Sequence, residues 1–335
     1  MGSPTPTQVM GLPKVPATAV TAGGYHACAL LSDGTAWCWG DGANGTIGSG
    51  TIPADGLFLT AQKVQGLTGA TAICAGGEHV CALSGGAGWC WGYDIFGELG
   101  NGEFITDGYM GSDLPVPVEG PTGGLLSGAT ALTCGAEHAC AVASGVLYCW
   151  GLDDSGQLGN GISGSGAGSG TAYATPQKVS LTDPPAIGTI AAGFGHSCLM
   201  FTNASVYCWG DNTYGQLGQQ LGPSGISMDA TPAVVPSVSA TALAAGGNRT
   251  CVVRSNGSVS CWGTPPLGNG TNTVSSSAVS VTGLPSAATA VSTGESGTCV
   301  ILNDKSVWCW GYNNYGDVGD GTFIERLTPV QVSGW

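Results

Sequence analysis

One phrase recurs six times along this chain: a cysteine, nine or ten residues further a second cysteine, and then Trp-Gly. The first cysteines of successive copies lie 53, 59, 58, 53 and 48 residues apart. That period suits a propeller blade of four short strands and exceeds what a helical hairpin or leucine-rich repeat needs. A unit of this size cannot bury its own apolar face, so the copies are expected to stack on one another. The copies begin at Cys28, Cys81, Cys140, Cys198, Cys251 and Cys299, and their second cysteines are Cys38, Cys90, Cys149, Cys208, Cys261 and Cys309.

Composition favours an all-β chain. Sixty glycines, eighteen prolines and only 8% charged residues leave little material for charge-paired surface helices, and no convincing amphipathic helix is present. No run of eighteen apolar residues occurs, so no membrane span is predicted. We therefore expect a single propeller domain over residues 1–335, built from four-stranded antiparallel blades. The expected repeat cores are residues 17–60, 70–114, 129–174, 187–230, 240–275 and 288–327.

The first copy shows how the strands are expected to run. Residues 17–30 are interpreted as one strand entered through glycines, residues 32–35 as a turn, and residues 36–40 as the returning strand. A Pro-x-x-Val phrase marks a further strand and occurs near both ends of the chain, at residues 5–9 and 328–332. Residues 328–335 are therefore predicted to close the array.

The hairpin register explains the cysteine pairs. Cys81 and Cys90 are centred on a Gly-Gly turn, which places them directly opposite each other in the ladder. Opposed Cβ atoms lie about 4.5–5.5 Å apart, near the distance that a disulfide requires. Because no Cys-x-x-Cys turn occurs, a staple is favoured over half a zinc site, and all six pairs are predicted to be intrablade disulfides. Cys74 and Cys134 fall outside this pattern, and either a bridge or two buried thiols would fit them.

Disulfides persist in oxidising compartments, so a secreted, periplasmic or cell-surface protein is expected. The sequence starts Met-Gly-Ser-Pro without a basic or apolar leader, and we expect an export signal to have been removed. Seven basic residues stand against 21 acidic ones, a net charge of −14. This charge repels phosphate backbones and predicts that nucleic acid is not a partner.

These phrases carry a family resemblance. Ala-Gly-Gly-x-His-x-Cys-Ala-Leu, then Asp-Gly-Thr-Ala-Trp-Cys-Trp-Gly, then Gly-x-Leu-Gly-Asn-Gly (residues 97–102 and 156–161) resemble the RCC1 (regulator of chromosome condensation) repeat over nearly the whole chain. The resemblance implies a β-propeller, commonly of seven blades. Six full motifs predict six blades here, with an incomplete or irregular seven-bladed form as the alternative. The paired cysteines look like those of exported bacterial relatives.

The resemblance implies several functions. The member that gives the family its name is a guanine-nucleotide exchange factor that binds chromatin, and a secreted bacterial member inhibits β-lactamases with one propeller face. Neither activity can be carried over to this sequence residue by residue. The net charge further disfavours exchange and chromatin binding.

The histidines and tryptophans follow the repeat. The chain has four histidines, each two residues before a first cysteine; Arg249 and Gly297 take that position in the last two copies. A ring of imidazoles around a metal is one interpretation, and a structural hydrogen bond repeated once per blade is the favoured one. The tryptophans after the second cysteines are expected to pack between blades, with an aromatic sugar-binding row as the weaker alternative. The histidines are His26, His79, His138 and His196.

Function is sought where the repeat varies, first at the positions before the histidines. These positions differ between copies and are expected to cluster at one end of the propeller axis. Glu78, Glu137 and Glu295 form the best acidic constellation and have the oxygen ligands that Ca²⁺ prefers, although solvated rim charge is the favoured interpretation. The candidate binding residues of this set are Tyr25, Glu78, Glu137, Asn248, Arg249 and Glu295.

The loops after the Leu-Gly phrases are the second irregularity. They are long in the first four copies and are expected to emerge on one side of the fold. Their scattered apolar groups suit a protein partner, while their Gly-Ser content equally permits plain linkers. The candidate contacts are Phe58, Phe104, Tyr109 and Tyr173.

No catalytic motif is present: the chain lacks a Gly-x-Ser-x-Gly elbow, a His-Glu-x-x-His helix and a phosphate-cradling loop. The leading hypothesis is an exported, monomeric, disulfide-stabilised propeller that binds a protein through one face and is more plausibly not an enzyme. The alternatives are a calcium-dependent hydrolase of the propeller-lactonase type, an enzyme inhibitor and a structural cell-surface subunit. No cofactor is predicted beyond the Ca²⁺ of the hydrolase hypothesis.

Overall fold

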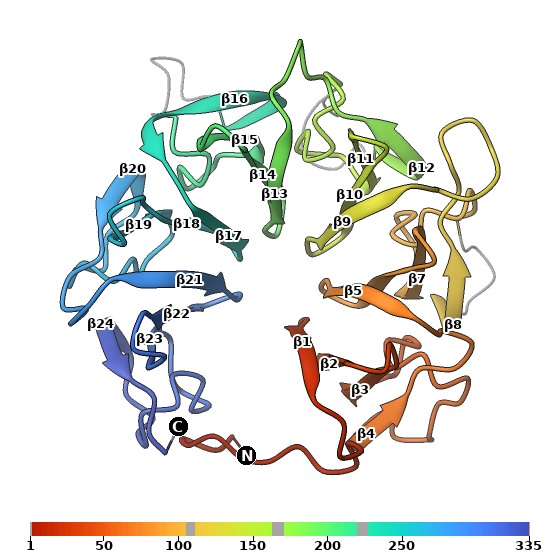
Figure 1. Cartoon of the computed structure of the whole chain (residues 1–335), viewed down its shortest axis with the longest axis horizontal. Helices are drawn as coiled ribbons and strands as arrows, with labels where there is room; N and C mark the ends of the chain where they lie inside the picture. Colours follow the sequence, from red (N-terminus) through yellow and green to blue (C-terminus); the bar gives the residue numbers. More distant parts are fainter. Residues whose placement is uncertain (1, 105–110, 163–170, 220–226, 335) are drawn as a thin grey trace. The chain divides into compact units, whose positions relative to one another are not determined.

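The computed structural model describes residues 2–104, 111–162, 171–219 and 227–334. These residues form strands β1 to β24 and no helix, arranged as six four-stranded antiparallel sheets (Figure 1). The fold is an all-β propeller of six blades, as the repeat count predicted. The chain divides into two compact units, an N-terminal unit of residues 9–181 and a C-terminal unit of residues 182–335 with residues 1–8. Each unit is described separately below.

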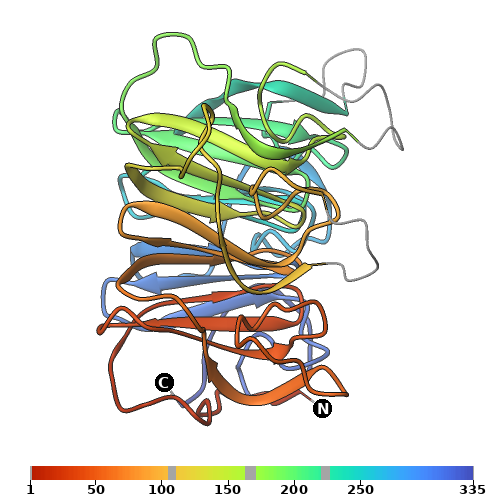
Figure 2. The ribbon, with the colours of Figure 1, turned by 90° about the vertical axis from the view of Figure 1, so that its right-hand side faces the viewer.

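The N-terminal unit contains blades 1 to 3. Within it the three sheets stack face to face (Figure 2), and the first strands of neighbouring blades are in contact. Blade 1 comprises β1 (Ala17–Ala22), β2 (His26–Leu31), β3 (Ala36–Asp41) and β4 (Leu57–Lys63); blade 2 comprises β5 (Ala70–Ala75), β6 (His79–Ser84), β7 (Ala87–Tyr93) and β8 (Gly111–Pro117); blade 3 comprises β9 (Ala129–Cys134), β10 (His138–Ala143), β11 (Val146–Leu152) and β12 (Ala172–Lys178).

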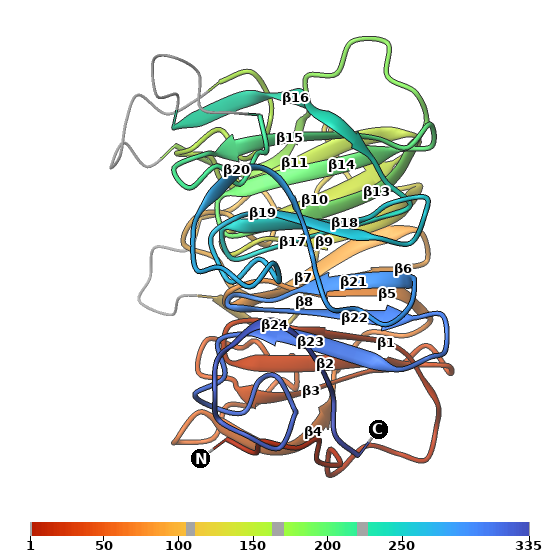
Figure 3. The same ribbon diagram turned by 90° about the vertical axis from the view of Figure 1, so that its left-hand side faces the viewer.

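The C-terminal unit contains blades 4 to 6, built in the same way (Figure 3). Its last strand covers part of the segment predicted to close the array, and β24 pairs with β23 of its own blade. Blade 4 comprises β13 (Ile187–Ala192), β14 (His196–Phe201), β15 (Ser205–Asp211) and β16 (Met228–Ser239); blade 5 comprises β17 (Ala242–Gly246), β18 (Arg249–Val253), β19 (Val259–Gly263) and β20 (Ser275–Ser280); blade 6 comprises β21 (Ala288–Thr293), β22 (Gly297–Leu302), β23 (Val307–Gly311) and β24 (Arg326–Gln331).

One strand prediction is wrong. Residues 17–30 form two strands, because the chain turns at Gly23–Tyr25 between β1 and β2. The Gly23 amide donates to the His26 carbonyl at 2.9 Å and closes this turn. A Cβ atom on Gly23 would lie 2.3 Å from the Gly76 carbonyl oxygen of blade 2, so the turn depends on the close approach that glycine allows.

All six predicted disulfides are present. Each joins directly paired residues of the second and third strands of one blade, with Cα atoms 4.0–4.1 Å apart. This spacing is that of a non-hydrogen-bonded antiparallel pair. The seventh disulfide joins Cys74 of β5 to Cys134 of β9 and therefore links blade 2 to blade 3. The structure settles the question that the sequence left open for these two cysteines.

Contacts between neighbouring blades, called seams below, are centred on the repeated tryptophans. Trp91, Trp150 and Trp262 are fully buried, and each donates its indole N–H to a backbone carbonyl of the preceding blade at 2.8–2.9 Å. The acceptors belong to Thr46, Glu98 and Gln216, which share one position of the Gly-x-Leu-Gly turn. The interblade role expected for the tryptophans is confirmed at these three seams.

Candidate functional site

The variable positions and the long loops of the N-terminal unit share one edge of the blades. In a four-stranded antiparallel meander, the turn between strands one and two lies at the same end as the loop between strands three and four. Gly24 N–H donates to Gly77 O, and Gly77 N–H donates to Ala136 O, both at 3.0 Å. These bonds connect the first turns of blades 1, 2 and 3 into a row. We call this row and the adjoining strand-three-to-four loops the loop edge.

Three predicted binding residues stand side by side in this row: Tyr25 in blade 1, Glu78 in blade 2 and Glu137 in blade 3. The Tyr25 side chain is 78% exposed and Glu78 is exposed, while Glu137 is half-buried. A Glu78 oxygen accepts a 2.6 Å hydrogen bond from Asn44 Nδ2 in the loop of blade 1. The variable turn of one blade is thus joined to the long loop of the preceding blade.

A small pocket of about 40 Å³ opens at this junction. Its lining combines an aromatic ring, carboxylates and an amide, supplied by the turns and by the loop of blade 1. The Asp41 carboxylate accepts the Ala43 backbone N–H at 2.9 Å, which fixes its orientation. The lining residues are Tyr25, His26, Asp41, Ala43, Asn44, Thr46, Gly77 and Glu78.

Acidic groups dominate the electrostatics of the loop edge. Burial, followed by the charges of Asp154 and Glu78, raises the pKa of Glu137. Burial, followed by the charges of Glu98, Glu78 and Glu137, raises the pKa of the Tyr93 hydroxyl. Burial is the larger cause of both shifts, and the neighbouring carboxylates add a smaller contribution of the same sign, because like charges raise the pKa of an acid.

Beneath this edge lie buried carboxyl groups that sequence reasoning did not single out. Glu98 and Asp94 are 1% and 0% exposed, and burial is the main cause that raises their pKa values to about 8 and about 7. One oxygen of Glu98 accepts the Phe96 N–H at 2.8 Å, while its other oxygen has no partner. The available signal was positional: Glu98 occupies the place that Gln157 and Gln216 hold in blades 3 and 4.

Charge is unevenly divided between the units. Residues 9–181 contain 13 acidic and 3 basic residues, a net charge of −10, and the rest of the chain contains 8 acidic and 4 basic residues, a net charge of −4. Among the described residues, Arg326 and Asp320 form the one ion pair, at 2.5 Å in blade 6. The carboxylates of the loop edge therefore have no basic partner within the described part of the chain.

The remaining candidates of the first set belong to the C-terminal unit. Glu295 is exposed in the turn before β22, and Asn248 is half-buried in the turn before β18. Arg249 is 2% exposed, and its Nη2 donates to the Pro265 carbonyl at 3.2 Å. Burial lowers the pKa of this guanidinium to about 10. These three side chains are thus not part of the row formed by the N-terminal turns.

The candidate loop residues are dispersed within the N-terminal unit. Phe58 is half-buried in β4 and packs against the core that blades 1 and 2 share, and Tyr173 is half-buried in β12, where it pairs with Gly151. Phe104 is 47% exposed in the loop that follows β7. Tyr109 lies outside the described residues. The three described residues therefore come from three different blades.

The histidines are buried at the seams. Burial lowers the pKa of His26 and His196 to about 4 and that of His79 to about 3, so all three are neutral at pH 7. Within the described chain, one group of three or more His, Cys, Asp or Glu residues has ligand atoms within 4.8 Å of one another: His79, Cys81 and Cys134. Both of its sulfur atoms are engaged in disulfides. Glu78, Glu137 and Glu295 do not form such a group.

The stacked four-stranded sheets, the seam tryptophans and the glycine-rich turns define a repeat β-propeller with an acidic loop edge. The chain belongs to the RCC1-like domain family, whose model matches residues 2–335.

The curated proteins that this chain resembles differ in kind and in length. The human E3 ubiquitin-protein ligase HERC2 is 28% identical over 64% of this chain, and the Arabidopsis thaliana ultraviolet-B receptor UVR8 is 30% identical over 59%. The chain spans 4% and 42% of these relatives' lengths.

The fold also matches solved structures. Human WBSCR16 superposes with a TM-score of 0.83 at 18% identity, covering 98% of this chain and 85% of that one. Prp20p from Saccharomyces cerevisiae, described with its binding to Gsp1p and histones, gives 0.77 at 19% identity, covering 94% and 76%. At these identities the structural matches establish the fold alone.

Proposed function

We propose that this chain is a protein-binding propeller whose N-terminal unit holds a basic segment of a partner on its loop edge. The observation that carries the proposal is the row of Tyr25, Glu78 and Glu137, whose carboxylates repel one another and have no basic partner in the described chain. A cationic side chain between them would relieve that repulsion.

The pocket between blades 1 and 2 suits the end of such a side chain. Its carboxylates and the Asn44 amide offer acceptor oxygens to an ammonium or guanidinium group. The exposed Tyr25 ring, which also lines the pocket, is available for a cation–π contact with the same cation. The net charge of −10 on the N-terminal unit would steer a basic partner toward it. The same charge argues against nucleic acid.

The disulfides support a location outside the reducing cytosol. None of the described cysteines is free, and seven disulfides are compatible with an oxidising compartment. The described residues include no helix that is long and apolar enough to cross a membrane. We propose that the protein acts as a secreted, periplasmic or cell-surface binding module rather than as an enzyme.

A peptide-binding measurement tests the proposed surface. The probes are a fluorescent lysine-rich peptide and a glutamate-rich peptide of equal length, titrated with the full chain at low ionic strength. We expect binding of the lysine-rich peptide alone, weakened by salt. Glu78→Gln with Glu137→Gln should weaken it about ten-fold, equivalent to about 1.4 kcal/mol.

The matched control removes equal charge from exposed positions of the C-terminal unit, with Glu295→Gln and Asp317→Asn. This control should bind almost as tightly as the wild type. Equal weakening by both double variants would show that only net charge matters and would overturn the assignment to the loop edge. Failure of the lysine-rich peptide to bind would overturn the proposal itself.

A further inference from the structure

Residues 3–8 take the place of a fourth strand, although they pair with no strand in the described chain. In three seams, a glycine amide of one blade donates to a carbonyl in the fourth strand of the next blade at 2.9–3.0 Å. Gly321 of blade 6 makes the same bond at 2.8 Å, and its acceptor is the Pro4 carbonyl. A proline follows each acceptor two residues later, as Pro6 follows Pro4. The three donor and acceptor pairs are Gly50 and Asp113, Gly102 and Ala174, and Gly270 and Leu327.

The inner strands that accompany such a fourth strand are missing beside residues 3–8. Thr7 follows the proline, and residues at this position in blades 2, 3 and 6 pair with the second cysteine of their blade. Thr7 has no such pairing among the residues that the structure describes. These paired residues are Val116 with Cys90, Gln177 with Cys149, and Val330 with Cys309.

The tryptophan of a following blade is missing as well. In four seams, a Cβ atom on the last glycine of the turn after strand three would lie 2.8–2.9 Å from the next blade's tryptophan. A Cβ atom on Gly319, which has this position in blade 6, would have Val332 and Pro6 as its nearest neighbours. Blade 6 thus meets the fourth strand of a next blade without that blade's inner strands. The four glycines are Gly48, Gly100, Gly218 and Gly268.

One face of blade 6 is exposed as a result. Val300 and Leu302 pack against blade 5, and side chains alternate along a strand, so Cys299 and Ile301 of β22 point the other way. Ile301 is 42% exposed, and Cys299 is half-buried although the other five first cysteines are 0–1% exposed. We call Cys299, Ile301 and its cross-strand partner Val307 the open face. The residues that correspond to Ile301 are 1–8% exposed, and they are Leu30, Leu83, Val142, Met200 and Val253.

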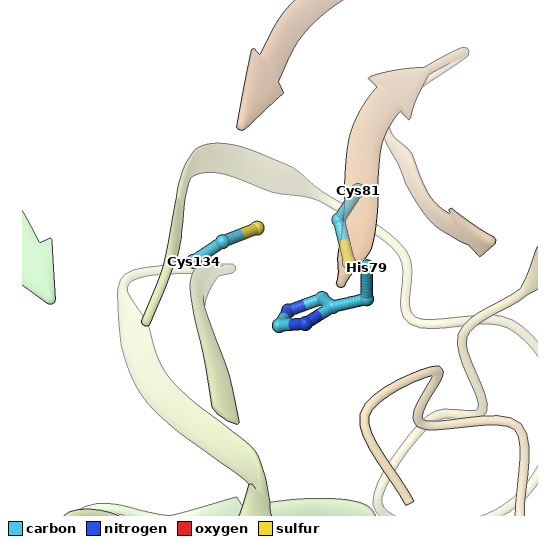
Figure 4. A group of neighbouring side chains, drawn as sticks. All are labelled: His79, Cys81 and Cys134. Atoms are coloured by element: carbon cyan, nitrogen blue, oxygen red, sulfur yellow. The ribbon is translucent and has the colours of Figure 1, made fainter. Parts of the chain in front are cut away.

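The corresponding face of blade 2 shows what normally covers these positions. Figure 4 shows Cys81 and His79 of blade 2 beside Cys134 of blade 3. Cys81 is 0% exposed and shares a core with Ala139 and Ala141 of blade 3. The last unit of a repeat array usually covers such a face with polar residues, whereas blade 6 leaves Ile301 exposed. The open face is therefore built as one side of a further seam.

We propose that the open face of blade 6 and residues 3–8 together receive three antiparallel strands from a partner protein, which complete a seventh blade. The third of these strands pairs with residues 5–8, as in other cases of β-strand addition. One side of the incoming sheet packs on Ile301 and Cys299, in continuity with the seams inside the unit. An aromatic side chain of its third strand packs on Gly319, where the other seams have tryptophan.

Charge and topology argue for a neutral or basic partner rather than a second copy of this chain. Each of the six described sheets already has four strands, so a second copy has no spare inner strands to donate. Its net charge of −14 would also repel an identical chain. Glu295 and Asp304, with a single basic residue, Lys305, flank β22. The partner strands therefore combine an apolar side with few or no acidic residues.

A peptide that carries three inner strands tests the open face. The probe is a fluorescent synthetic peptide with the sequence of residues 242–263, oxidised between its two cysteines. This sequence forms β17 to β19 in blade 5 and contains two arginines and no acidic residue. We expect it to bind the full chain and to slow amide hydrogen exchange at Thr7 and Gln8. A peptide of the same composition in scrambled order should do neither.

Two variants assign the binding to the proposed surface. Ile301→Asp should weaken probe binding about ten-fold, because it places a charge in a contact that excludes water. Since Ile301 is already 42% exposed, this variant should fold. Removal of residues 2–8 should weaken binding as well. The matched control is Val234→Asp, at a 50% exposed position of β16 in the same unit, and it should bind like the wild type.

Three results would overturn the proposal. The first is failure of the probe to bind, and the second is equal binding by the wild type and Ile301→Asp. The third is dimerisation of the chain alone in analytical ultracentrifugation that Ile301→Asp abolishes, because the open face would then belong to a second copy. None of these results bears on the lysine-rich peptide and the loop edge.

Discussion

The seam between blades 2 and 3 and the seam between blades 4 and 5 have the same backbone arrangement, but different side chains connect their blades. The first carries the Cys74–Cys134 disulfide, whereas the second has Ala191 and Ala245 at the corresponding positions. In the first seam His79 Nε2 has no partner, whereas in the second His196 Nε2 lies 2.9 Å from Thr250 Oγ1 and it is the Nδ1 atom of His196 that has none. One seam has a covalent bond between its blades, and the other has a hydrogen bond between its histidine and the facing strand.

The hydrogen bonds of the second seam form a connected set. Thr250 donates its hydroxyl proton to the Gln216 carbonyl at 2.9 Å, so it must accept the proton of His196 Nε2. The Gln216 side chain in turn donates to Asp211 at 2.7 Å. Blade 3 has Ala139 in place of Thr250, and blade 2 has Glu98 in place of Gln216. The comparison teaches that the same backbone arrangement can be held by a disulfide in one seam and by a chain of side-chain and backbone hydrogen bonds in another.

Removing the disulfide should have the largest effect. Cys74→Ala with Cys134→Ala gives the first seam the small residues of the second, and it opens a loop of sequence separation 60. Chain entropy predicts a loss of about 4 kcal/mol in the free energy of unfolding. Urea unfolding measures it, with Cys299→Ala/Cys309→Ala as the comparison, because that disulfide closes a loop of separation 10. A smaller loss for the interblade pair than for this control would contradict the entropic account.

Replacing the glycine that packs against the seam tryptophan, a residue type present at this position in both seams, should have the second largest effect on stability. A Cβ atom on Gly100 would lie 2.8 Å from Trp150 at φ +64°, and a Cβ atom on Gly69, also at φ +64°, would meet nothing within 4 Å. Gly69→Ala should cost about 1 kcal/mol for backbone strain. Gly100→Ala should cost about 3 kcal/mol because steric overlap is added. Comparing the thermal unfolding of the two variants separates the contact with Trp150 from the backbone strain. Equal losses of stability would show that this contact does not contribute.

Glu98→Gln should change the pH dependence of stability. The pKa of Glu98 rises from 4.5 to about 8 on folding, so the folded chain binds the extra proton and stability falls as pH rises from about 4.5 through 8. The variant should gain on the order of 2 kcal/mol at pH 8 and little at pH 5.

Urea titrations at both pH values measure the effect of Glu98→Gln. Gln216→Glu in the second seam is the reciprocal control and should destabilise increasingly as pH rises. A gain for Glu98→Gln that is the same at pH 5 and pH 8 would show that Glu98 does not hold the proton.

The smallest effect is expected from supplying the missing hydroxyl. Ala139→Thr gives His79 the partner that Thr250 gives His196, and one hydrogen bond contributes about 1 kcal/mol. Val80, at the same position of blade 2, shows that a branched side chain fits there. Thr250→Ala should lose a comparable amount. Differential scanning calorimetry of both variants tests the pair, and a loss for Ala139→Thr would mean that blade 3 lacks the space.

The sequence permitted prediction of the repeated parts of the fold. The six hairpin disulfides and the interblade tryptophans followed from register and repeat phase, which depend only on neighbours along the chain. The division of residues 17–30 into two strands was missed. From the sequence alone Gly23 and Gly24 fit within a strand, and the turn there becomes apparent only when the close contact between Gly23 and Gly76 of the next blade is seen. The bridge between Cys74 and Cys134 was undecided for the same reason: it depends on a distance between blades.

The candidate site was predicted only in outline. Tyr25, Glu78 and Glu137 were chosen because they vary at one repeat position, and hydrogen bonds between the turns bring them into one row. Glu98 was missed because a glutamate in a glycine-rich turn resembles a solvated charge, and only packing reveals its burial. Glu295 is also acidic, but it lies one residue before the corresponding repeat position, and it belongs to the other unit.

The interblade disulfide also changes what a protease can do to this protein. Residues 121–125 form an exposed stretch between β8 and β9, inside the segment that Cys74 and Cys134 enclose. A cut there leaves both products joined through sulfur, so the nicked chain migrates as one species until it is reduced. Damage at this exposed stretch therefore does not release a fragment, and the blades on either side of the cut remain tethered.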